Sequence, residues 1–96
     1  KMKKEDINIQ NLSEPDVINT STKNRRSFIR GWNEAVDNKS LGTAESGEDT
    51  WRTVGWHAGK IFGPQKDKFR HTLFLWTTNQ RRLALGLPMI DHLNDD

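Results

Sequence analysis

The sequence contains no cysteine and no tyrosine among its 96 residues, and it has no long apolar run. The absence of cysteine excludes disulfides, thiolate metal sites and thiol nucleophiles. A membrane span needs about 20 consecutive apolar residues, and a signal peptide needs a shorter apolar segment near its start; neither pattern is present. We therefore expect a small cytoplasmic protein of one domain, without a bound metal or cofactor.

Charges of opposite sign are separated along the chain, although the formal net charge is only +2. Residues 52–90 contain seven Lys and Arg but one Asp, whereas the stretches 41–51 and 91–96 each carry three acidic residues and no base. A basic stretch of this kind indicates an anionic partner, but a solvated helical surface has the same composition. Both interpretations stay open at this point.

Three segments repeat apolar residues with the period of an amphipathic helix, at about 23–37, 50–62 and 66–85. Their apolar stripes are Phe28, Ile29, Trp32, Ala35 and Val36; Trp51, Val54, Ala58, Ile61 and Phe62; and Phe69, Leu73, Trp76, Leu83 and Ala84. Gly63-Pro64 and Gly86 predict the ends of the second and third helices. The fold class is therefore predicted to be all-α, a small three-helix bundle.

Two glycines, Gly55 and Gly59, lie inside the second predicted helix. Each costs up to about 1 kcal/mol relative to alanine in a helix interior. Their spacing favours a close approach of another backbone in the core over a contact with a ligand.

The predicted helical domain spans residues 23–88, between an N-terminal arm at 1–22 and an acidic tail at 89–96. The arm is polar, with one short alternation at Ile7 and Ile9. Three interpretations remain for it: an edge strand, an extended arm over a neighbour, or disorder.

Catalysis is not expected. His57, His71 and His92 are far apart in sequence and no catalytic motif accompanies them. His57 and His71 fall on the outer sides of their helices, where surface histidines are common. The acidic residues Glu48 and Asp49 are placed to cap the second helix, which weakens their interpretation as a metal site.

Trp56 falls on the side of the second predicted helix opposite its apolar stripe. Arg52 and Lys60 stand four residues before and after it, so the three side chains form one basic and aromatic line. Such a line binds single-stranded nucleic acid by stacking and phosphate contacts, and Trp and Arg are also enriched at protein interfaces. A further alternative places Trp56 in a second small core beside the glycines.

The third predicted helix adds a second group of candidates. Its middle is apolar nearly all round, so this part is either central in the fold or in contact with a partner. Phe74, Leu75 and Leu85 lie off the main stripe, and we expect them to be exposed. Lys66, Arg70 and Arg81 share a sector, with Lys68 and Arg82 elsewhere on the surface. The predicted protein-binding residues are Arg52, Trp56, Lys60, Phe74 and Leu85; the alternative nucleic-acid-binding residues are Arg52, Trp56, Lys60, Lys66, Lys68 and Arg70.

Residues 27–63 contain the patterns Phe28-x-x-Gly31-Trp32-x-x-Ala35-Val36 and Thr50-Trp51-x-x-x-Gly55-Trp56-x-x-Gly59-x-x-Phe62-Gly63. This part of the chain resembles a short helical module of multidomain prokaryotic defence proteins of the restriction type. The resemblance implies an accessory role near nucleic acid or in a defence complex, and it supplies no catalytic residue.

The sequence therefore predicts a non-catalytic interaction module, a small adaptor or inhibitor that docks a protein partner in defence or counter-defence. The alternative is a nucleic-acid-binding accessory domain that uses a basic and aromatic helix face. Self-association is a further expectation, because a thin core with exposed apolar residues gains from burying more area.

Overall fold

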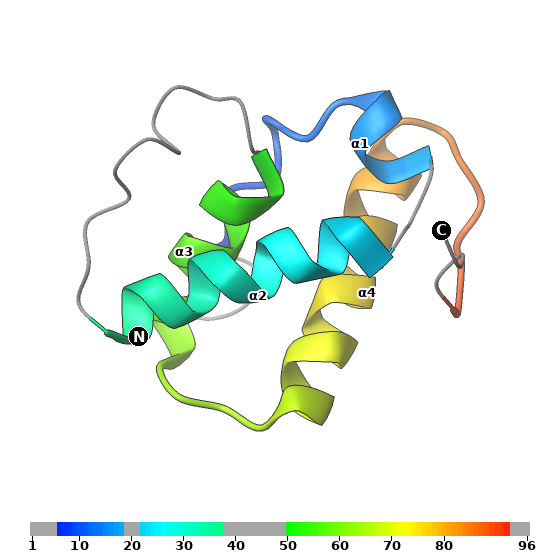
Figure 1. Ribbon diagram of the computed structural model, residues 1–96. Helices are drawn as coiled ribbons and strands as arrows, with labels where there is room; N and C mark the ends of the chain where they lie inside the picture. Colours follow the sequence, from blue (N-terminus) through cyan, green and yellow to red (C-terminus); the bar gives the residue numbers. More distant parts are fainter. Residues whose placement is uncertain (1–5, 19–21, 38–49, 93–96) are drawn as a thin grey trace.

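The computed structural model describes residues 6–18, 22–37 and 50–92, and its helices are α1 (Glu14–Ile18), α2 (Thr22–Val36), α3 (Thr50–Phe62) and α4 (Asp67–Ala84). Figure 1 shows α2 crossing the front of the molecule, with α3 behind it and α4 running steeply past its N-terminal half. Within the described ranges there is no strand. The all-α prediction is confirmed, and three helices lie within one residue of their predicted bounds.

The crossing of α2 and α3 is a contact of backbone against backbone. A Cβ on Gly55 would overlap the Phe28 carbonyl, and a Cβ on Gly31 would overlap the Arg52 carbonyl. A Cβ on Gly59 would stand 2.7 Å from the Trp32 oxygen. The predicted close approach at Gly55 and Gly59 is confirmed, and Gly31 supplies the matching gap on the partner helix.

A cluster of aromatic rings fills the space between this helix pair and α4. The Phe28 ring lies 5.7 Å from Trp32, 6.0 Å from Trp51 and 5.5 Å from Phe74, and Trp51 lies 4.5 Å from Phe74. The Trp32 indole N–H donates to the Gly63 carbonyl at 2.8 Å, so its one polar atom is satisfied inside the core. The prediction that Phe74 is exposed is wrong: α4 meets α3 through this ring, which is fully buried.

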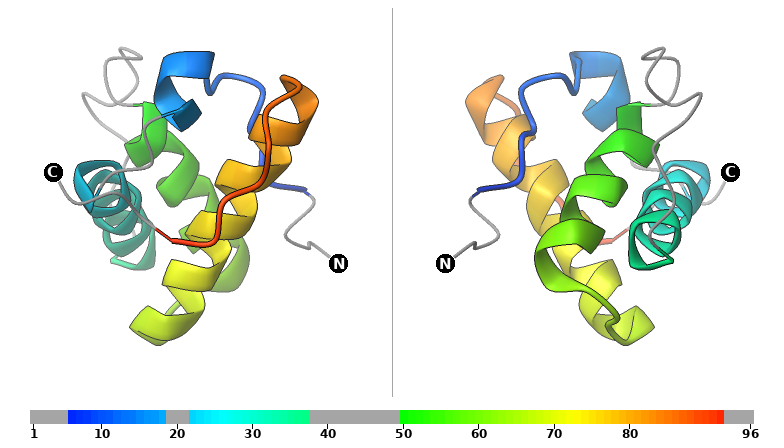
Figure 2. Two further views of the ribbon diagram at one scale, coloured as in Figure 1. Left: turned by 90° about the vertical axis from the view of Figure 1, so that its right-hand side faces the viewer. Right: turned by 90° about the vertical axis from the view of Figure 1, so that its left-hand side faces the viewer.

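The described part of the N-terminal arm packs on the chain's own core. Ile7, Leu12 and Val17 are buried, and the Trp51 indole donates to the Asp16 carbonyl at 3.0 Å. Residues 6–18 therefore form an arm that ends in the short helix α1. This helix lies beside the C-terminal end of α4 (Figures 1 and 2). Residues 6–18 are thus not an edge strand; the rest of the predicted arm, residues 1–5 and 19–21, lies outside the described ranges, so its predicted disorder is tested only in part.

After α4 the chain turns at Gly86, whose φ is +80°, and residues 87–90 return along the helix. The Asn79 side chain exchanges two hydrogen bonds with the Ile90 backbone, both of 2.8 Å. The Arg82 guanidinium donates to the carbonyls of Pro88 and Val17, at 2.7 and 2.8 Å. Arg82 was expected on the surface, and it is buried because it joins this returning segment to α1.

Three residues of the predicted apolar stripe of α4, Phe69, Leu83 and Ala84, are also placed differently, since all three are exposed. Phe69 is 39% exposed at the first turn and Leu83 is 51% exposed at the last. Phe69 and Leu83 stand at opposite ends of α4, and the Phe69 ring keeps contact with Trp32 and Phe62 at its edge. No helix in the described ranges is long and apolar enough to span a membrane.

Candidate functional site

Arg52, the first residue of the predicted basic and aromatic line, is held inside the helix pair. Its Nε donates to Glu34 Oε1 on α2 at 2.7 Å, and its Nη2 bonds to Glu34 Oε2. The two side chains are only 14% and 19% exposed. A bidentate pair of this kind fixes the angle between two helices, so the structure gives Arg52 an internal partner.

Trp56 is half-buried at the edge of the α2–α3 crossing, between exposed His57 and exposed Lys60. The Lys60 Nζ lies 5.1 Å from the centre of the Trp56 ring, and the His57 ring lies 5.4 Å away, edge to face. The ammonium therefore engages the ring on which a nucleobase would have to stack. Of the predicted line, Trp56 and Lys60 contact each other, while Arg52 is turned to Glu34.

The basic residues at the start of α4 also include both exposed side chains and one that bonds to another helix. Lys66 and Lys68 are exposed. Arg70 donates to the Asn33 side chain at 2.9 Å and lies 3.5 Å from Asp67, so its guanidinium joins α4 to α2. Two of the six predicted nucleic-acid-binding residues, Arg52 and Arg70, thus hold helices together.

His71 belongs to the same junction between α2 and α4. Arg25 Nε donates to His71 Nδ1 at 3.0 Å, and Arg25 Nη2 bonds to Asp67 Oδ2 at 2.6 Å. The sequence placed His71 on an outer surface, whereas the structure makes it a half-buried hydrogen-bond acceptor between helices. A ring nitrogen that accepts from arginine carries no proton of its own in this arrangement.

The predicted protein-binding residues are not one surface. Phe74 is in the core, whereas Leu85 is 37% exposed at the C-terminal end of α4. Leu85 is one of four exposed apolar residues in the segments that Arg82 joins; the others are Ile18 at 52%, Leu83 at 51% and Met89 at 62%. We call this set, Ile18, Leu83, Leu85 and Met89, the apolar end.

The four residues of the apolar end belong to segments that Arg82 connects. Leu83 follows Arg82 in the chain, and the Leu85 amide donates to the Arg82 carbonyl at 3.1 Å. Ile18 follows Val17 and Met89 follows Pro88 in the chain. The carbonyls of Val17 and Pro88 accept hydrogen bonds from the Arg82 guanidinium. Sequence patterns missed this grouping since Ile18 and Met89 lie outside the three predicted helices.

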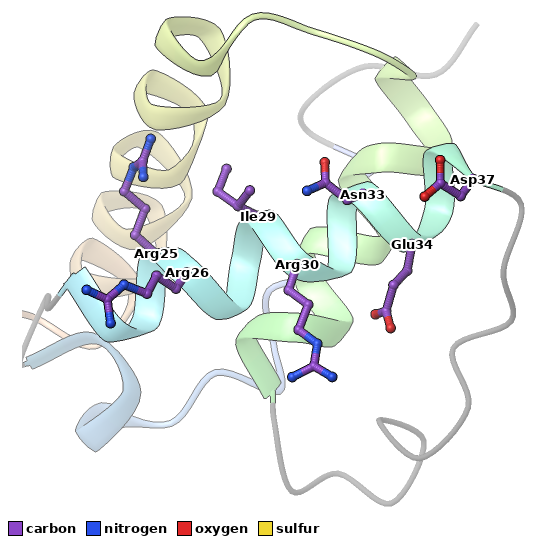
Figure 3. A pocket seen from close by; sticks show the side chains of 7 residues that line it. All are labelled: Arg25, Arg26, Ile29, Arg30, Asn33, Glu34 and Asp37. Carbon is purple, nitrogen blue, oxygen red and sulfur yellow. The ribbon is translucent and has the colours of Figure 1, made fainter.

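A shallow groove runs along α2, and all the side chains that line it come from this helix (Figure 3). Its volume is about 510 Å³. It is lined by Arg25, Arg26, Ile29, Arg30, Asn33, Glu34 and Asp37. Ile29 belongs to the predicted apolar stripe, and the first three turns of α2 contain four bases and no acid.

In the described part of the chain, no three His, Asp or Glu side chains gather as a metal site requires. No protein-family model, curated protein sequence or solved structure matches this chain. The resemblance of residues 27–63 to a defence module therefore stays a prediction, and the function has to be argued from the two surfaces described above.

Proposed function

We propose that this chain is a non-catalytic interaction module that docks a protein partner through the apolar end. The observation that carries the proposal is the concentration of exposed apolar residues in the segments that Arg82 joins. Of the five large apolar residues exposed in the described ranges, four belong to the apolar end. Single exposed apolar residues are ordinary on a soluble protein, but several gathered at one place are typical of protein interaction sites.

The frame behind this surface suits a docking module. Arg82 and Asn79 tie α1, α4 and the returning segment together with hydrogen bonds of 2.7 to 2.8 Å. The apolar side chains are thus presented by segments that are already ordered, which lowers the entropic cost of binding. The resemblance of residues 27–63 supports a role as an adaptor or inhibitor in defence or counter-defence, and the cytoplasmic location predicted from the sequence fits that role.

The test replaces Leu83 and Leu85 together by Asp and measures which proteins from a nuclease-treated native lysate are retained. Thr72→Asp, on an exposed position of the same helix, is the matched control. We expect a protein that the wild type and the control retain in equal amounts and that the double variant loses at least tenfold, about 1.4 kcal/mol of binding. Thermal unfolding checks that the double variant is folded.

Light scattering on the same three proteins separates a foreign partner from a second copy of this chain. A dimer that the double variant loses identifies the second copy as the partner. Equal retention of every protein by the wild type and the folded double variant, with no change in mass, contradicts the proposal.

A further inference from the structure

Arginine side chains in α3 and α4 act as internal connectors. Arg52 bonds to Glu34, and Arg70 bonds to Asn33. Arg81 and Arg82 donate to the carbonyls of Leu12 and Val17. Within the described residues, arginines on these two helices are thus explained by the fold.

The outer face of α2 is different. Lys23, Arg26 and Arg30 are exposed, and among the residues that the structure describes none of the three has a hydrogen-bond or ion-pair partner. They lie within a sector of about 60° on the helix, given 100° per residue. Figure 3 shows the Arg26 and Arg30 side chains extending from α2.

This arrangement of charge opposes helix stability. Cations near a helix N-terminus are disfavoured by the macrodipole, and Lys23 and Arg26 lie in the first two turns of α2. Arg26 and Arg30 are four residues apart, a spacing at which like charges repel by a few tenths of a kcal/mol. Lys23, Arg26 and Arg30 therefore carry charge that is unfavourable near the start of α2, and an external anion would offset their repulsion.

The dimensions fit a linear polyanion. Seven residues of helix span about 10 Å, and each strand of a nucleic-acid duplex carries one phosphate per about 3.4 Å of its axis. The three cations of α2 thus match about three phosphates. At the other end of the groove Glu34 and Asp37 are acidic, so a phosphate chain would cross the N-terminal half of α2 only.

We propose that Lys23, Arg26 and Arg30 form a binding site for the phosphate backbone of a nucleic acid on the outer face of α2. This site is separate from the apolar end and does not depend on the protein-docking proposal. It also differs from the nucleic-acid-binding residues predicted from the sequence, since it uses a different helix and needs no stacking on Trp56.

The test measures the affinity of the wild type for a labelled DNA duplex of about 20 base pairs by fluorescence anisotropy, between about 50 and 200 mM salt. Three phosphate contacts give a slope of about −2.7 in log affinity against log salt. The double variant Arg26→Ala/Arg30→Ala is expected to reduce the magnitude of this slope by about 1.8. Both side chains are exposed, so folding is retained.

The matched control is Lys66→Ala/Lys68→Ala, which removes the same charge from another exposed surface. The proposal predicts that this control keeps the wild-type slope and that Arg26→Lys/Arg30→Lys keeps most of the affinity. An equal loss in both double alanine variants would show a response to net charge alone and overturn the site. Absence of duplex binding at low salt, or equal affinity for polyglutamate, would overturn it as well.

Discussion

Gly55 carries no side chain because the carbonyl of Phe28 occupies the space where a Cβ would stand. In most helix interiors a change from Gly to Ala stabilises the protein by up to about 1 kcal/mol. Here the added methyl group would meet backbone, which cannot rotate away as a side chain can. The sign of the usual effect should therefore be reversed.

We expect Gly55→Ala to lower the free energy of unfolding by about 1–3 kcal/mol, as overpacking in a tight core does. Urea unfolding followed by circular dichroism measures the change. Thr72→Ala, on an exposed position of α4, serves as the control and should leave stability within about 0.5 kcal/mol. A Gly55→Ala protein as stable as the wild type would show that the helices do not touch at this point.

For single residues, the sequence predicted which side of a helix a side chain occupies but not which side chain it contacts. Arg52 and Arg30 look alike in a one-dimensional pattern, since both lie on polar sides of amphipathic helices. Arg52 meets Glu34 only because α2 and α3 cross there, eighteen positions apart in the chain. Candidate sites chosen by charge alone therefore mixed structural arginines with exposed ones.

The periodic apolar pattern predicted α2, α3 and α4, but it did not predict the short helix α1. The bounds of α3 follow from its stripe and from Gly63-Pro64, where Gly63 adopts a φ of +68°. α1 has five residues, too few to show a period. A local signal was present nonetheless: Asp16 Oδ2 accepts from the Ser13 amide at 2.8 Å and from its hydroxyl at 3.0 Å, as in a capping box.

The misplacement of Phe74 has a related cause. A helical wheel assumes that one stripe faces one core, which holds for α2. α4 instead meets α3 through Phe74 and the N-terminal arm through Arg81, so several sides of it are covered. Such a helix buries residues all round its middle and exposes stripe residues at its ends, as Leu83 shows.

The end of α4 depends on one side chain, which leads to a prediction for the element. Arg82→Met keeps much of the volume but removes the donors to Val17 and Pro88. Hydrogen bonds from charged donors contribute about 1.5–3 kcal/mol each, so we expect the loss of two to lower the unfolding free energy by about 3–6 kcal/mol. Amide hydrogen exchange should quicken in α1 and in residues 87–90.

Arg26→Met is the control for this change, because Arg26 is exposed on α2. Its effect on stability should stay within about 0.5 kcal/mol. If both variants lose the same stability, or if exchange quickens evenly over all helices, Arg82 does not join these segments as described.

For the molecule as a whole, the N-terminal arm is part of the core. Removal of residues 1–21 would uncover the surface covered by Ile7, Leu12 and Val17. Burial of each such side chain contributes about 1.5–3 kcal/mol, so the three together approach the 5–15 kcal/mol stability of a typical domain. We expect the shortened chain to lose cooperative thermal unfolding by circular dichroism.

Point variants of the full chain separate this effect from a general consequence of truncation. Leu12→Ala should cost about 2–5 kcal/mol, whereas Asn11→Ala, exposed beside it, should cost less than about 0.5 kcal/mol. A shortened chain that melts cooperatively near the wild-type temperature would contradict the packing of the arm.

The contact between α2 and α3 at Gly31, Gly55 and Gly59 also bears on how such a sequence can diverge. Two helices usually stand 8–10 Å apart, at a distance set by the side chains between them. Here backbone atoms set the distance, so substitutions on the outward positions do not shift the two axes. The outer face of α2 can therefore exchange one set of side chains for another, and one ligand for another, while the frame beneath it keeps its geometry.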